Sequence, residues 1–324
     1  MILRYLSLSR HRQVFLSITG LRVPEFDALL GDVLPPLART EAQRHSHPAR
    51  RRAAGAGPPF ALCPRDQILL CVVWLRQYPT QEVLGYLFGV SDSTVLRVVA
   101  RVLPLLEAAG RDTMRLPDPG RKRRRHLDAL LANTPGLAVV IDSFEQRVQR
   151  PGKPGQEGGN DVVPAQVGGK DRFYSGKKKQ HTLKSQVAVD EQSGKFVDIS
   201  DSVPGPTADL VLLERSGLLR RLPAGVGGLG DLAYLGLWAL HPQGLGATPR
   251  RKPRGKERPP EDVAYNQAFS RRRIVVEHSI GRLRRYQSVT QMDRHHRLNH
   301  APRVVAIAGL VNRQIDHRLG SCVC

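Results

Sequence analysis

The stretch GLAVVIDSF (136–144) has the form of a buried β-strand that leads directly into an acid. A short unbroken apolar run bounded by turn-forming residues is typical of a strand covered on both faces. Asp142 follows four apolar residues, so its carboxylate is expected at the end of that strand. A glycine-rich stretch, GVGGLGDLAY (225–234), contains a weaker strand that ends at Asp231. We therefore predict one sheet that carries two acids at the ends of its strands.

A third acid lies on a long helical stretch, EDVAYNQAFSRRRIVVEHSIGRLRRYQ (261–287). Its apolar stripe is formed by Val276, Ile280 and Leu283. Glu277 is one residue, or about 100°, from that stripe. We expect the Glu277 carboxylate at the edge of the packed face, directed along the sheet and not toward bulk water.

Three carboxylates gathered around one sheet repel each other unless a cation compensates their charge. Mg²⁺ takes carboxylate oxygens and keeps water and phosphate as its other ligands. Two such ions about 3.5–4 Å apart clamp the attacking and leaving oxygens of a phosphoryl transfer. The alternative treats each acid separately. Asp142 and Asp231 are then turn-forming residues, and Glu277 pairs with Arg273 one helical turn earlier, an exposed pair worth about 0.3–0.5 kcal/mol.

The charge balance indicates a polyanionic partner. The 324 residues include 50 Lys and Arg against 29 Asp and Glu, a net charge of +21. A surplus of that size is most often used to neutralise phosphates and release their counterions. A GC-rich genome would also enrich arginine, and that explanation stays open. The hydrophobic content of 40% excludes a disordered chain.

The remaining bulk features point to a soluble, intracellular protein. The four cysteines form no CxxC pairs, so zinc is not expected and a reducing compartment is. The sequence contains no apolar run of 18 residues and no signal-peptide pattern, so we expect no membrane association.

A helix-turn-helix is predicted in TQEVLGYLFGVSDSTVLRVVARVLPLLE (80–107). Thr80 is expected to cap a short helix, Gly89 to turn the chain, and Ser91 to cap a longer helix. The polar face of the second helix is suited to a DNA major groove. Its candidate DNA-binding residues are Ser93, Thr94, Arg97 and Arg101. The alternative is an ordinary helical hairpin with a solvated basic face.

The expected organisation has four parts. Residues 1–110 form a helical DNA-binding domain, and 111–128 form a linker that carries five successive basic residues. Residues 129–318 form an α/β catalytic domain, and 319–324 form a tail. Residues 152–172 have the composition of a loop next to the first strand.

From about Phe26 to Asn312, the sequence resembles a DDE transposase of the bacterial insertion-sequence type, in the branch related to Harbinger elements. The resemblance is carried, in order, by VVIDSFEQRVQRP (139–151), FYSGKKKQHTLKSQVAVD (173–190), LGDLAYLG (229–236), YNQAFSRRRIVVEHSIGRLRRY (265–286) and AIAGLVNR (306–313). It implies a ribonuclease-H-like catalytic domain, a mixed sheet flanked by helices, preceded by an all-α helix-turn-helix domain. Asp142 would lie on the first strand, Asp231 after the fourth, and Glu277 on the following helix.

The resemblance also implies roles for individual residues. Asp142, Asp231 and Glu277 would be catalytic and would hold two Mg²⁺ or Mn²⁺ ions. Arg273 and Arg284 would contact phosphate near the cut. The family's SGKKKxHT run implies backbone contacts by Lys177, Lys178 and Lys179, and its Asp-x-x-Tyr pattern is matched by Tyr234. The sequence departs from the family at Arg284 (more often Lys), Ser270 (often Tyr) and Ala208 (frequently His), the last beside the retained Asp209.

The function implied is that of a transposase. It would bind the terminal inverted repeats of its element, cut DNA strands with metal-activated water, and join the freed 3′-hydroxyl to target DNA. Pairing of two element ends implies at least a dimer on DNA, associated with the nucleoid. The alternatives are a catalytically inactive or domesticated DNA-binding regulator and a nuclease with the same fold.

Overall fold

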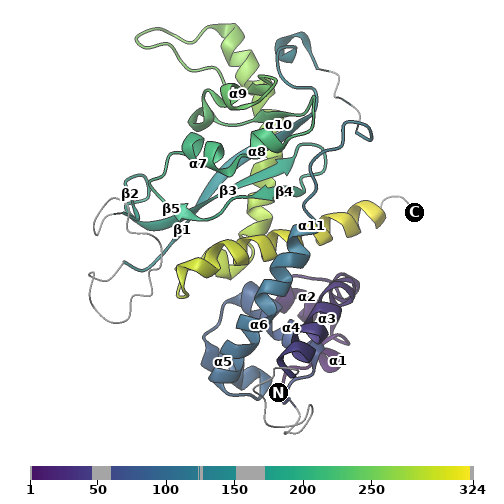
Figure 1. Cartoon of the computed structure of the whole chain (residues 1–324). Helices are drawn as coiled ribbons and strands as arrows, with labels where there is room; N and C mark the ends of the chain where they lie inside the picture. The colour runs from purple at the N-terminus through teal and green to yellow at the C-terminus, as the bar shows by residue number, and fades with distance from the viewer. Residues whose placement is uncertain (1, 46–59, 123, 125–126, 151–171, 322–324) are drawn as a thin grey trace. The chain divides into compact units, whose positions relative to one another are not determined.

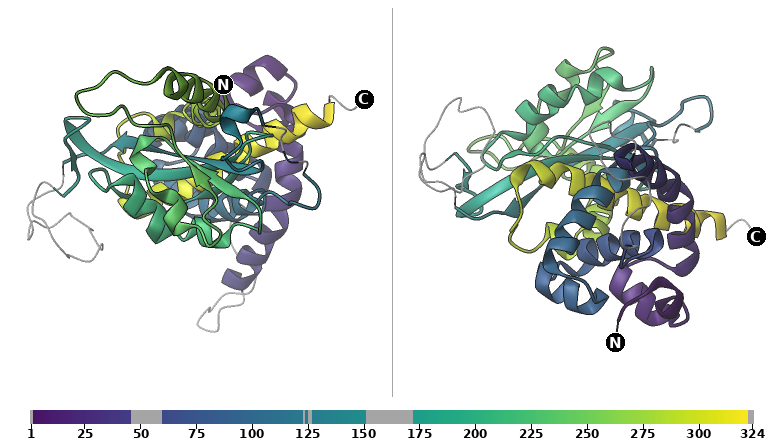
Figure 2. Two further views of the ribbon diagram at one scale, coloured as in Figure 1. Left: turned by 90° about the horizontal axis from the view of Figure 1, so that it is seen from above. Right: turned by 60° about the horizontal axis from the view of Figure 1, so that its bottom comes forward.

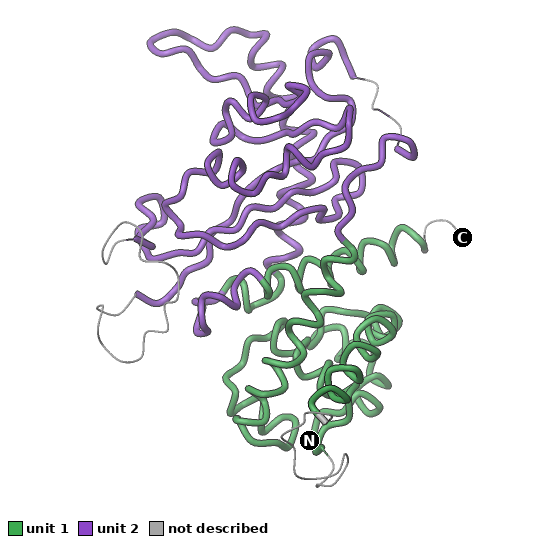
Figure 3. Tube along the Cα trace, viewed as in Figure 1, with its two compact units in different colours: residues 1–113, 285–290, 302–324 green, residues 114–284, 291–301 purple. Residues whose placement is uncertain are grey.

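In the computed structural model, the chain forms two compact units (Figure 3). The structure describes residues 2–45, 60–122, 124, 127–150 and 172–321. Unit 1 comprises residues 1–113, 285–290 and 302–324, and unit 2 comprises residues 114–284 and 291–301. The loop expected at 152–172 lies outside the described residues except for Arg172, as do residues 123, 125 and 126 of the basic linker.

Unit 1 is helical and is built around α4 (Figure 1). Its helices are α1 (Tyr5–Leu8), α2 (Arg12–Thr19), α3 (Val23–His45), α4 (Pro64–Gln77), α5 (Gln81–Phe88), α6 (Asp92–Arg111) and most of α11 (His300–Ser321), with the 3₁₀ turn η3 (Gln287–Val289). Every residue of α4 from Asp66 to Leu75 is buried. A helix that is buried all round must be covered on every side, so the other helices pack about it.

The C-terminal helix belongs to unit 1. The sequence instead predicted that residues 129–318 form one α/β domain. Three contacts account for this placement. The Asn312 amide donates to the Thr113 hydroxyl at 3.1 Å, and the Arg303 guanidinium donates to the Tyr78 hydroxyl at 3.1 Å. The third contact is a close crossing of α6 and α11, in which Gly309 faces the backbone of Gly110.

Replacing Gly309 with alanine is expected to lower the free energy of unfolding by about 1–3 kcal/mol, the usual cost of overpacking. An added methyl group would meet the Gly110 backbone, which cannot move aside as a flexible side chain could. Gly281→Ala on α10 is the control, because nothing lies within 4 Å of the position. There, alanine is expected to stabilise by about 0.5–1 kcal/mol through its higher helix propensity. Urea denaturation measures both, and equal effects would contradict the close crossing.

The described residues of unit 2 form a seven-stranded sheet with helices on its faces (Figures 1 and 2). The strands are β1 (Ala138–Arg147), β2 (Tyr174–Ser175), β3 (Gln180–Asp190), β4 (Phe196–Ile199), β5 (Val203–Pro204), β6 (Gly227–Leu229) and β7 (Gly246–Ala247). The helices are α7 (Asp209–Ser216), α8 (Leu218–Arg221), α9 (Leu237–Leu240) and α10 (Pro260–Leu283), with the 3₁₀ turns η1 (Ala129–Leu131), η2 (Leu232–Tyr234) and η4 (Arg297–Asn299). The core between the sheet and α7–α9 includes Val139, Ile141, Leu213 and Leu237.

The sheet is mixed, and β1 lies where its two halves meet. The strand order is β2-β3-β1-β6-β7, with β4 and β5 also paired to β3. On one side, β1 pairs with β3 antiparallel, and β3 pairs with β4 antiparallel. On the other side, β1, β6 and β7 run parallel. This order confirms the expected ribonuclease-H-like unit, and it places the carboxyl ends of β1's parallel neighbours along one edge.

A buried ion pair anchors α10 to the rest of unit 2. The Arg272 guanidinium donates two hydrogen bonds of 2.7 Å to the Glu191 carboxylate, and both side chains are almost fully buried. The same guanidinium donates to the Thr134 hydroxyl at 2.6 Å and the Pro135 carbonyl at 2.7 Å. Because a bidentate pair fixes direction as well as distance, it sets the rotation of α10 and therefore where Arg273 points.

Among the described residues, no single helix is both long and apolar enough to cross a membrane. Within the same residues, α5 and α6 reach that length and hydropathy only when the two helices are taken together, and they are bent at the break between them.

Candidate nucleic-acid and carboxylate sites

The helix-turn-helix forms with the caps that the sequence predicted. The Thr80 hydroxyl accepts the N–H of Val83 at 3.3 Å, and the Ser91 hydroxyl accepts the N–H of Thr94 at 3.2 Å. Between the two helices, Gly89 has a φ of 63°, which suits glycine. The two helices meet at 96°, as in a helix-turn-helix motif.

The exposed start of α6 carries three of the four predicted DNA-binding residues. Ser93 and Arg97 are exposed, and Thr94 is half-buried. Arg101 instead contacts other residues of unit 1. Its guanidinium pairs with Glu41 at 2.7 Å and lies 5.4 Å from the centre of the Phe60 ring. Of the four predicted residues, Ser93, Thr94 and Arg97 therefore remain at the surface of this helix.

Asp142 lies in the middle of β1 and not at its end, because β1 continues beside β3 as far as Arg147. The parallel pairing with β6 stops much earlier, at Val140 opposite Leu229. Continuing that register by two residues brings Asp142 level with Asp231, the residue that follows β6. The two acids predicted from their matching strands therefore lie at the same edge of the parallel half.

Charge and burial act together on Asp142. Burial raises the pKa of its carboxyl group, and the neighbouring carboxylates of Asp231 and Asp209 raise it further. The N–H of Ser143, which donates to Asp142 at 2.7 Å, and the Arg273 guanidinium oppose that rise in pKa. A nitrogen of Arg273 lies 3.8 Å from Asp142 Oδ2. The site is thus a carboxylate cluster next to one cation from α10.

Asp209 is a neighbour to which sequence reasoning assigned no role. At the start of α7, its Oδ1 accepts from the Ser143 hydroxyl at 2.6 Å and lies 3.1 Å from the buried Lys184 ammonium. Lys184 also donates to the Thr207 carbonyl at 2.6 Å. The only sequence signal was its place in the family-like stretch VPGPTADL (203–210). These contacts fix the chain beside Asp142.

Tyr234 is a buried residue next to the three carboxylates of the cluster. It is 1% exposed, and burial raises its pKa well above the ordinary value, with added effects from Asp209, Asp142 and Asp231. The turn before it requires glycine at position 230, because a Cβ there would come within 2.6 Å of the Tyr234 Cβ. This close approach explains the glycine directly before Asp231.

Glu277 lies on α10, one turn beyond Arg273, but its side chain is exposed. The expectation that it faces the sheet and not bulk water is wrong. The buried line of α10 runs through Arg272, Val276, Ser279 and Leu283, and Glu277 lies past its edge. Within the described residues, no three His, Cys, Asp or Glu side chains are grouped closely enough to hold a metal ion.

The donor set at the paired acids nevertheless fits a divalent cation. Asp142 and Asp231 supply carboxylate oxygens, which Mg²⁺ and Mn²⁺ accept as ligands. Their mutual repulsion, together with the burial of Asp142, is relieved by a cation. The Asp231 carboxylate already accepts the N–H of Ala233 at 2.9 Å through Oδ1, which fixes its direction.

The other predicted phosphate contacts are exposed. Lys177, Lys178 and Lys179 lie in the turn between β2 and β3, and Lys179 has a φ of 54°. Arg284 is the exposed residue that follows α10. Of the residues predicted around the cut, the structure brings together Asp142, Asp231 and Arg273, and it does not bring Glu277 into that group.

Two family models match the chain. The model described as DDE superfamily endonuclease matches residues 141–312, which is more than half of the sequence. The model described as helix-turn-helix of DDE superfamily endonuclease matches residues 60–112, which include α5 and α6.

Curated relatives agree with these models. A transposase named for insertion sequence element IS702 of Microchaete diplosiphon is 26% identical over 82% of this chain and 85% of its own length. The HARBI1 proteins of Bos taurus and Homo sapiens, whose name describes a nuclease, are 24% and 23% identical over 67% of this chain. The match spans only 56% of those two proteins.

Among solved structures, a chain of a pre-cleavage Mos1 transpososome is 11% identical over 86% of this chain and 98% of its own, with a TM-score of 0.22. The match that carries weight is the endonuclease family model, which includes all three predicted acids and most of the mixed sheet around them. The protein belongs to the DDE superfamily endonucleases.

Proposed function

We propose that this endonuclease is a transposase that binds the terminal inverted repeats of its element, cuts DNA and joins the freed ends to a target. The observation that carries the proposal is that Asp142 and Asp231 are neighbouring carboxylates at one edge of the sheet, beside Arg273. The likeness to the IS702 transposase across most of both chains supports it.

Asp142, Asp231 and Glu277 would hold the Mg²⁺ or Mn²⁺ ions, two in number. When bound, such ions lower the pKa of a coordinated water and stabilise charge on the transferred phosphoryl group. Arg273 would keep the acidic pair compensated and would contact the phosphate next to the cut. Asp209 would hold Ser143, and with it the backbone beside Asp142, in position.

The remaining residues would hold DNA. On α6, the proposal assigns base-edge and backbone contacts to Ser93, Thr94 and Arg97, and it leaves out Arg101 because of its ion pair with Glu41. Phosphate contacts would come from Lys177, Lys178, Lys179 and Arg284. Because two element ends must be joined, the protein would act as an oligomer on DNA, on the bacterial nucleoid in the cytoplasm.

The test is Mg²⁺-dependent nicking of a duplex that carries the element ends, with wild type and Asp231→Asn. Wild type should cut, and a chelator should stop it. Asp231→Asn should cut at least about 10³-fold more slowly while binding the duplex as wild type does. If wild type binds the ends but cuts no DNA with Mg²⁺ or Mn²⁺, the protein is a DNA-binding regulator and the proposal fails.

A nuclease without joining activity is the second candidate, because the HARBI1 proteins are named as nucleases. A target plasmid added to the same reaction separates the two. Insertion of the cut end into the plasmid supports the transposase, and cutting without insertion under all metal conditions supports the nuclease.

A further inference from the structure

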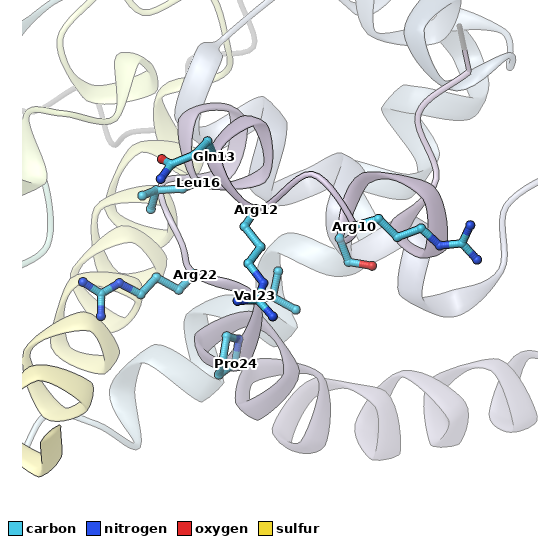
Figure 4. A pocket seen from close by; sticks show the side chains of 8 residues that line it. Arg10, Arg12, Gln13, Leu16, Arg22, Val23 and Pro24 are labelled. Atoms are coloured by element: carbon cyan, nitrogen blue, oxygen red, sulfur yellow. The ribbon is translucent and has the colours of Figure 1, made fainter. Parts of the chain in front are cut away.

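Unit 1 contains a cavity of about 540 Å³ that is separate from the helix-turn-helix (Figure 4). It lies where the α1–α2 turn, α2 and the start of α3 meet. Its lining residues are Ser9, Arg10, Arg12, Gln13, Leu16, Arg22, Val23 and Pro24. Three of these eight residues carry a full positive charge.

The three arginines are uncompensated. Arg10, Arg12 and Arg22 are exposed, and within the described part of the chain none of their guanidinium groups has an ion-pair or hydrogen-bond partner. The single acid in residues 9–25 is Glu25, which is buried, and its Oε2 accepts the backbone N–H of Arg22 at 2.7 Å. Unpaired like charges around one hollow repel each other, and an anionic partner would remove that cost.

The directions of the side chains favour a polymer over a single small anion. In Figure 4, Arg12 extends across the cavity toward Val23 and Pro24, whereas Arg10 and Arg22 extend away from it on opposite sides. One phosphate could not contact three guanidinium groups that diverge in this way. A nucleic-acid backbone presents successive phosphates, and arginine binds them through its planar donors.

The segment that contains α1 and α2 is fixed to the rest of unit 1 by hydrogen bonds, and a binding surface requires such a rigid support. The N–H of Tyr5 donates to Asp66 on α4 at 2.7 Å, and the Gln77 amide donates to the Ser17 carbonyl at 2.9 Å. The N–H of Leu3 donates to the carbonyl of Leu87, on α5, at 2.7 Å. These bonds fix α1 and α2 to the helices that carry the helix-turn-helix.

The residues that line the cavity come from the α1–α2 turn, α2 and the start of α3, and none of them belongs to α5 or α6. In Figure 1, α2 and α3 lie on the other side of α4 from α5. The family model for the helix-turn-helix matches only residues 60–112 and does not include the cavity. A partner at the arginines is therefore a second contact.

We propose that Arg10, Arg12 and Arg22 form a second, sequence-independent binding site for the phosphate backbone of double-stranded DNA, apart from the helix-turn-helix. The inference rests on the proposed function in one respect, which is that duplex DNA is the polyanion this protein binds. Contacts of this kind add affinity for every sequence and increase the dependence of binding on salt.

The test compares the full-length wild type with the triple variant Arg10→Gln, Arg12→Gln, Arg22→Gln. Fluorescence anisotropy gives the affinity for a labelled random-sequence duplex over a range of salt concentrations, without a divalent metal. The slope of log K against log salt should become shallower by about 2–3, since each lost phosphate contact removes about 0.9. The matched control replaces Arg39, Arg215 and Arg254, which are exposed and do not line the cavity.

The control removes the same net charge, and its slope should change by less than about 1. Circular dichroism should show unchanged folding, because all six side chains are exposed. An unchanged slope in the triple variant, or an equal change in the control, overturns the inference. Because no cleavage is measured, this result is independent of whether the enzyme cuts or joins DNA. Conversely, a protein that binds with the expected slopes but never cuts would refute only the transposase proposal.

Discussion

Replacing Glu277 with glutamine is expected to slow metal-dependent DNA cleavage by about 10³-fold or more, which equals about 4 kcal/mol of transition-state stabilisation. The family resemblance assigns this residue to the ions, yet its side chain is exposed and lies outside the acidic group around Asp142. No described residue forms an ion pair or hydrogen bond with it. Its loss should therefore leave stability unchanged and report on chemistry alone.

Glu261→Gln is the matched control for Glu277→Gln. Both acids are exposed on α10 and neither has a partner among the described residues, but Glu261 lies in the first turn of the helix, far from Asp142. The control should cut at the wild-type rate. Single-turnover cleavage of an end-containing duplex measures both variants. Wild-type cleavage by Glu277→Gln would show that another carboxylate completes the ion site, and Asp209 would be the first to test, because it already neighbours Asp142.

Replacing Glu191 with glutamine is expected to lower the free energy of unfolding by about 3–5 kcal/mol, because it leaves the Arg272 charge buried without a counter-ion. Arg272 is 4% exposed, and its guanidinium donates four hydrogen bonds, two of them to Glu191. Denaturation in urea, followed by circular dichroism, measures the loss. The same variant should cut DNA poorly even when folded, since the pair sets the rotation of α10.

Two further variants separate charge from packing. The double variant Glu191→Leu, Arg272→Met removes both charges and should recover most of the lost stability, as buried pairs replaced by apolar residues often do. Asp262→Asn, which breaks the more exposed pair with Arg250 on the same helix, should cost about 1 kcal/mol or less. Equal losses in Glu191→Gln and Asp262→Asn would contradict the anchoring role.

Local chemistry explains what could be predicted from the sequence. The helix-turn-helix was predictable because Thr80, Gly89 and Ser91 act within one or two turns of their own positions. The proximity of Asp142 and Asp231 was predictable because equivalent positions on neighbouring parallel strands meet at the same edge of a sheet.

The errors come from partners that are distant in sequence. The length of β1 is set by its pairing with β3. Asp142 therefore lies inside the strand, although the local sequence predicted that the strand ends there. Arg101 is occupied by Glu41, sixty residues earlier in the chain, and no periodicity in α6 reveals that ion pair. The exposure of Glu277 depends on which face of α10 the Arg272–Glu191 pair turns toward the sheet.

The discontinuity of unit 1 has a consequence for synthesis on the ribosome. Residues 1–113 emerge long before residues 302–321, whose helix covers Gly110 and Tyr78. Nascent chains generally fold domain by domain from the N-terminus, but here the first unit to be translated is completed only after the second has been made. Until then, the apolar surface that α11 covers stays exposed, and the unit that contains the helix-turn-helix is completed after the unit that carries Asp142 and Asp231.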